Sequence, residues 1–165
     1  MPTYDVNNGV WARSLNEACY RWLPSAAAFR PVDSWPSEGR FGNKLRNVLY
    51  MGLTPAAAAS EFLRRHPEFL LLQDASRIRI WGFDVTVSDP VLDVRTEAKA
   101  DLINFPFDRL KSNDADERAR YTECRELATD VEEKGTGIEY PSPALAGGGV
   151  PSPVWFPWLG LGDYG

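Results

Sequence analysis

The sequence predicts a single α+β domain, and three observations lead to this prediction. First, a chain of 165 residues with 44% hydrophobic side chains can build one sizeable core. Second, Arg77–Val87 alternates apolar and polar residues as strands do, whereas Arg118–Lys134 carries its apolar residues in a helical stripe. Third, the chain contains no internal repeat and no linker long enough to divide it.

The N-terminal part predicts a short amphipathic helix over Trp11–Leu23. Its apolar residues follow helical spacing: Trp11, Leu15, Ala18, Cys19 and Trp22. Pro24 would stop this helix. We therefore divide the chain into a helical extension, residues 1–27, which packs on the main domain, residues 28–165.

The next stretch predicts two strands joined by a loop. Ala28–Val32 is compatible with a first strand, and the Gly, Pro and Ser content of Asp33–Gly42 is typical of a loop. This loop would carry Arg40. Val48–Met51 then predicts a compact apolar strand that ends at Gly52.

A well-delimited helix is predicted after this strand. Thr54 is a good N-cap, Pro55 suits the first helical position, and four alanines follow. The helix should end at His66, because the following Pro67 disfavours helical backbone in the residue before it. Glu61 would therefore lie on this helix.

The remaining elements alternate between strands and helices. Strands are predicted at Arg77–Val87, Val91–Val94, Ile138–Tyr140 and Val154–Phe156. Helices are predicted at Glu97–Ile103 and Arg118–Lys134, and a Gly/Pro-rich loop at Ala144–Pro153.

Composition excludes several classes of function. A net charge of −5 and a pI near 4.9 argue against a direct electrostatic grip on nucleic acid. Cys19 and Cys124 form no metal-ligand or disulfide pattern, which indicates core thiols in a cytoplasmic protein. With His66 as its one histidine, the chain predicts no metal site. No apolar run approaches the roughly 20 residues of a membrane span.

Four residues have the chemistry of a site that binds NAD and breaks its nicotinamide–ribose bond. Arg40 could pair with pyrophosphate, and Tyr50 could stack on the cationic nicotinamide ring. Glu61 could stabilise the positive charge that develops on the ribose, and Ser142, between two prolines, could fix orientation. Each has a structural alternative. Arg40 could be a solvated loop residue, Tyr50 a core aromatic, Glu61 the exposed partner of Arg65, and Ser142 part of a rigid turn.

The segments that hold these residues resemble the RES domain, the toxin half of bacterial Xre–RES toxin–antitoxin pairs. In chain order they are Glu38–Asn43, Asn47–Gly52, Thr54–Glu61 and Gly137–Ser142. The resemblance runs from about Phe29 to Phe156. It implies an ADP-ribosyltransferase-like fold, with a mixed β core and flanking helices.

The resemblance also implies a function and partners. The family consumes NAD, and an Xre-type antitoxin binds DNA and occludes the toxin's site; a dimer within the antitoxin complex is expected. Arg40, Tyr50, Glu61 and Ser142 match the family's motifs, and Asn43 matches the segment after the arginine. This chain has Phe41 where the family has a tryptophan, and Gly42 separates that aromatic residue from Asn43.

The sequence therefore predicts a toxin that degrades NAD as a substrate and needs no cofactor. Water and phosphate are both open as acceptors, since neither requires a motif of its own. Two alternatives remain: transfer of ADP-ribose to a protein target, and a catalytically inert module that only binds a partner.

Overall fold

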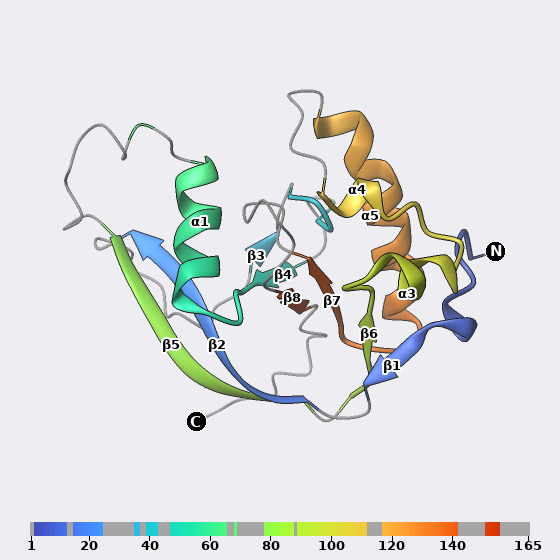
Figure 1. Cartoon of the computed structure of the whole chain (residues 1–165), viewed down its shortest axis with the longest axis horizontal. Helices are drawn as coiled ribbons and strands as arrows, with labels where there is room; N and C mark the ends of the chain where they lie inside the picture. Colours follow the sequence, from blue (N-terminus) through green and yellow to red (C-terminus); the bar gives the residue numbers. More distant parts are fainter. Residues whose placement is uncertain are drawn as a thin grey trace.

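A mixed sheet forms the centre of the molecule (Figure 1). The computed structural model describes residues 2–12, 15–24, 35–36, 39–42, 47–65, 68, 78–87, 89–111, 117–141 and 151–155. Within these residues the sheet has six strands, in the order β1 (Val10–Ala12), β6 (Val91–Asp93), β7 (Gly137–Pro141), β8 (Pro151–Trp155), β4 (Asn47–Tyr50) and β3 (Trp35–Pro36). β6 and β7 are parallel, and the other neighbours are antiparallel.

A second, two-stranded sheet forms a long curved ribbon (Figure 1). β2 (Leu15–Pro24) pairs antiparallel with β5 (Ile78–Val87) over its whole length. One bridge ties this ribbon to the end of β4: Tyr20 and Gly52 exchange backbone hydrogen bonds of 2.7 and 2.8 Å. The ribbon therefore approaches the chain just after Tyr50.

The helices fall into two groups. α1 (Pro55–Arg65) lies against the concave side of the ribbon, whereas α3 (Glu97–Asp101), α4 (Asp108–Lys111) and α5 (Glu117–Glu132) gather beside the central sheet (Figure 1). A short 3-10 turn, η1 (Val6–Asn8), precedes β1.

The core is divided by the central sheet, because successive side chains of a strand point to opposite faces. On β4, Val48 belongs to the helix-side cluster, which includes Leu127 and Ile138, and the adjacent Leu49 belongs to a smaller cluster with Cys19 and Val91. The predicted stripe of α5 is buried as expected: Cys124, Leu127, Ala128 and Val131 are all 0% exposed.

The helix predicted over Trp11–Leu23 is wrong, since the described residues of this stretch belong to β1 and β2. Both faces of β2 are partly covered, so its apolar residues do not alternate with polar ones as in a half-buried strand. Their spacing therefore looked helical. Cys19 is buried on one face, while Trp22 on the other packs edge to face on Phe62 of α1, with ring centroids 4.8 Å apart. Pairing with β5 overrides local preference. The helical character of residues 1–27 is thus wrong; the division at residue 28 stays a prediction.

Most other elements confirm the predictions. These are β4, α1, β5, β6, α3, α5 and β7, with end points shifted by a few residues. The strand predicted at Val154–Phe156 begins earlier, at Pro151, while α4 and β3 were not predicted. The strand predicted at Ala28–Val32 lies outside the described residues.

Candidate functional site

Arg40 lies in a tight turn, residues 39–42, between β3 and β4. The Gly42 N–H donates to the Gly39 carbonyl at 3.1 Å. Phe41 fixes this turn to the core, because it is fully buried and packs edge to face on Tyr140 of β7 at 5.0 Å. The neighbouring Arg40 is thereby held in place.

The side chain of Arg40 is buried against the corner formed by α4 and α5. The residue is 4% exposed. Its Nη1 donates to the backbone carbonyl of Arg109, and its guanidinium carbon lies 5.3 Å from the centroid of the Tyr121 ring. The Cys124 thiol donates to the same Arg109 carbonyl at 3.9 Å. Arg40 is therefore not a solvated loop residue, and that alternative is wrong.

Tyr50, the last residue of β4, is joined directly to the turn that holds Arg40. Its hydroxyl oxygen accepts a hydrogen bond from the Phe41 N–H at 3.0 Å. The ring is half-buried and packs on the helix-side cluster. The fold thus brings two of the predicted site segments together, and Tyr50 is partly exposed there.

Glu61 lies on α1, whose start is packed tightly against the end of β4. A Cβ on Gly52 would lie 2.8 Å from the Ala58 nitrogen and 2.9 Å from the Ala57 Cβ, so only glycine allows this approach. Thr54 caps the helix as predicted, accepting the Ala57 N–H at 3.0 Å. Glu61 follows Ala57 by four residues and Ala58 by three, which places it on the same face of α1.

Two predicted site residues, Ser142 and Asn43, lie outside the described residues. Ser142 directly follows the last residue of β7.

The alternative for Glu61 stays open. Glu61 is partly exposed. The structure does not describe the side chain of Arg65, so the proposed Glu61–Arg65 pair stays an alternative.

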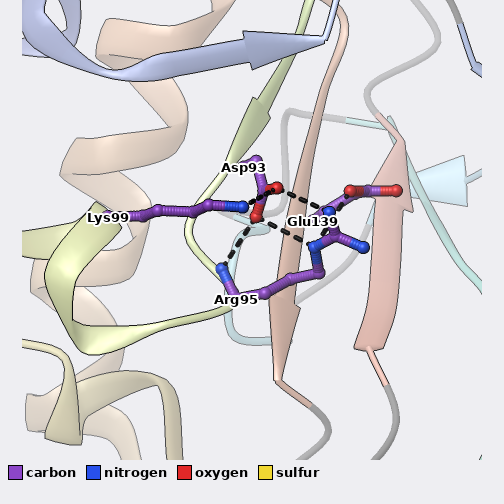
Figure 2. Close-up of polar contacts among 4 residues, drawn as sticks. All are labelled: Asp93, Arg95, Lys99 and Glu139. Atoms are coloured by element: carbon purple, nitrogen blue, oxygen red, sulfur yellow. Dashed lines mark hydrogen bonds and ion pairs between the residues drawn. The ribbon is translucent and has the colours of Figure 1, made fainter.

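A charge cluster with two buried carboxylates lies at the end of β6, beside the middle of β7, and the sequence analysis missed it (Figure 2). Asp93 and Glu139 are register neighbours on the parallel strands, 4% and 1% exposed. Arg95 binds Asp93 through its backbone N–H at 3.1 Å and through two side-chain nitrogens at 3.0 and 2.6 Å, and its Nε lies 3.4 Å from Glu139. Lys99 of α3 donates to Asp93 at 2.5 Å. Acidic residues within the apolar runs Val91–Val94 and Gly137–Tyr140 were the available signal.

This cluster predicts how stability depends on pH. Burial alone would raise the pKa of the Asp93 carboxyl, but hydrogen bonds from Arg95 and Lys99 outweigh burial and leave its pKa below the ordinary 3.8. A carboxyl whose pKa is lowered by folding stabilises the protein above that ordinary value and ceases to do so as the pH falls further. We expect the melting temperature to fall below about pH 4. In Asp93→Asn this fall should be shallower, and an unchanged profile would contradict the assignment.

The cysteines are buried thiols, as predicted. Burial raises the pKa of Cys124 to about 11, against the opposing effect of the Arg40 guanidinium. The thiol therefore stays protonated at neutral pH and is a poor nucleophile. Within the described residues no group of three or more His, Cys, Asp or Glu side chains could hold a metal ion. No helix in that part of the chain is long and apolar enough to span a membrane.

Comparisons with known proteins bear on both family and fold. The protein-family model of the RES domain matches residues 13–150 of this chain. No curated protein matches the chain. A chain in the crystal structure of the M. tuberculosis MbcT–MbcA toxin–antitoxin complex is similar, with a TM-score of 0.66 and 19% identity. The similarity covers 90% of this chain and 77% of that one, which confirms the predicted α+β fold.

Proposed function

The chain belongs to the RES domain family, and from this premise we propose that it is the toxin of a toxin–antitoxin pair that consumes NAD. The observation that carries the proposal is the hydrogen bond between Phe41 and Tyr50. It joins the segment of Arg40 to the segment of Tyr50, as a single NAD pocket would require. The tight packing of α1 on the end of β4 brings the helix of Glu61 against the same region.

The proposed reaction breaks the bond between nicotinamide and ribose. An oxygen of water or phosphate attacks the anomeric carbon, and the electrons of the broken bond pass to nicotinamide, which leaves neutral. The acceptor's proton is released to solvent. Because the leaving group is already cationic in NAD, no general acid is needed, and the main requirement is to stabilise the oxocarbenium-like ribose.

Each proposed site residue has a distinct role in this reaction. Arg40 would bind the pyrophosphate, and Tyr50 would stack on nicotinamide. Glu61 would face the ribose, and its carboxylate would stabilise the positive charge as nicotinamide departs. Ser142 would orient the substrate, with Asn43 as a further contact.

A direct test is to incubate the purified protein with NAD, with and without phosphate, and to identify the products. Free nicotinamide with ADP-ribose would indicate hydrolysis, and a phosphorylated ADP-ribose formed only with phosphate would indicate phosphorolysis. Label from NAD found on protein would support a transferase instead. No nicotinamide release in any arm would contradict the proposal.

We predict that EDTA leaves the rate of nicotinamide release unchanged, because the proposed site uses no metal.

We predict that expression of this chain without an antitoxin arrests bacterial growth and lowers NAD before other metabolites. The physical reason is that an enzyme of this kind removes a shared redox carrier from the cytoplasm, where we place the protein. Co-expression with its proposed Xre-type antitoxin should restore growth. Metabolite measurement after induction checks the fall in NAD, with Glu61→Gln as a matched control. Arrest with unchanged NAD would count against NAD as the substrate.

Light scattering of the toxin–antitoxin complex would test the expected homodimer.

A further inference from the structure

We propose that Tyr121 of α5 is a positioning residue for Arg40, holding the guanidinium in the orientation in which it meets the substrate's phosphates. This proposal rests on the proposed function, because it assigns Arg40 to pyrophosphate binding. Tyr121 would not contact the reacting atoms. It would act through Arg40 alone.

The geometry around Arg40 supports this role. The guanidinium carbon lies 5.3 Å from the centroid of the Tyr121 ring, within the range in which a cation gains from an aromatic face. Tyr121 is 8% exposed, so its ring is fixed by packing. A fixed ring beneath a planar guanidinium limits how that group can turn.

Two further contacts come from the same corner. The Arg109 carbonyl accepts a hydrogen bond from Nη1 of Arg40 and a second one, at 3.9 Å, from the Cys124 thiol. Arg109 is held in turn, because its Nε pairs with Glu123 of α5 at 2.6 Å. The carbonyl binds one nitrogen of the guanidinium, whereas the central carbon of that group lies over the Tyr121 ring. Tyr121 is therefore the group whose side chain can be changed to test this orientation.

Arg125 provides a matched control on the same ring. Its guanidinium carbon lies 5.7 Å from the centroid of Tyr121. If the ring served any nearby cation equally, Arg125→Met and Tyr121→Leu would have the same effect on NAD kinetics. If Tyr121 acts through Arg40, Arg125→Met should leave KM within about twofold of wild type.

The main experiment is a double-mutant cycle between Tyr121→Leu and Arg40→Met, with NAD kinetics as the readout. We expect Tyr121→Leu to raise KM roughly five- to tenfold while kcat stays within about twofold. Tyr121→Phe keeps the aromatic face and should stay near wild type. In the Arg40→Met background, Tyr121→Leu should add no further rise in KM. An equal rise in both backgrounds, or with Arg125→Met, would overturn the proposal.

A second cycle on stability separates this proposal from the proposed function. Urea midpoints of the same four proteins, read without NAD, should show that the two substitutions are not additive. Absence of NAD turnover in wild type would overturn the proposed function, and the stability cycle would still decide on the Tyr121–Arg40 contact. Strict additivity there would overturn the contact. Should Tyr121→Leu unfold, Tyr121→Met, whose flexible unbranched side chain adapts better to an irregular space, takes its place in both cycles.

Discussion

Glu61→Gln should slow nicotinamide release on the order of 100-fold or more while NAD affinity stays close to wild type. Glutamine keeps the shape of the side chain and removes its negative charge. That charge would matter little to bound NAD, but it would stabilise the positive ribose that appears only as nicotinamide leaves. An interaction made only in the transition state lowers kcat and kcat/KM together when it is removed.

Chromatographic assay of nicotinamide, together with calorimetry of NAD binding, tests this prediction. Glu133→Gln, an exposed residue in the turn after α5, is the matched control and should leave both quantities unchanged. If Glu61 were only the exposed partner of Arg65, the change would cost well under about 1 kcal/mol of stability and leave turnover intact. Wild-type turnover in Glu61→Gln would therefore remove Glu61 from the proposed site.

Helix caps and apolar periodicity predicted the elements whose buried faces match the pattern of their own sequence. The cap at Thr54 fixes the start of α1, and the apolar stripe of α5 has one buried face against the sheet. β2 behaves differently, because α1 covers part of one face through Phe62, and Cys19 on the other face is buried in the cluster of Leu49 and Val91. A strand that is covered on both faces loses the alternation of apolar and polar residues that identifies a half-buried strand. Its identity then depends on pairing with β5, about 60 residues away.

Only part of the candidate site could be predicted, because several of its contacts join segments that are distant in the sequence. Motifs in chain order identified Arg40 and Tyr50, but the contact between Tyr50 and the neighbouring Phe41 is made by a backbone N–H, which no motif encodes. The surroundings of Arg40 come from α4 and α5, nearly 70 residues or more along the chain. The pairing of Asp93 with Glu139 follows from the parallel register of β6 and β7, which becomes visible only in the fold.

Arg40→Ala should lower NAD affinity roughly 10- to 100-fold, as expected for loss of one charge-assisted pair, and leave kcat within a few-fold. The charge of the pyrophosphate hardly changes during the reaction, so Arg40 would bind ground and transition states alike, and its loss would appear in KM. Because Arg40 is 4% exposed and donates to the Arg109 carbonyl, the same substitution should also lower the melting temperature. Stability and binding must therefore be measured separately.

Two variants separate the binding role of Arg40 from its structural role. Arg40→Lys keeps the charge but loses the planar fork that pairs bidentately with phosphate, so it should bind NAD more weakly than wild type and more tightly than Arg40→Ala. Arg79→Ala, on the exposed part of β5, should change neither affinity nor stability. Calorimetry in the slow Glu61→Gln background prevents turnover during the titration. If Arg40→Ala lowered the melting temperature but bound NAD as tightly as its parent, Arg40 would serve only to fasten the 39–42 turn to the α4–α5 corner, and the pyrophosphate would need another cation.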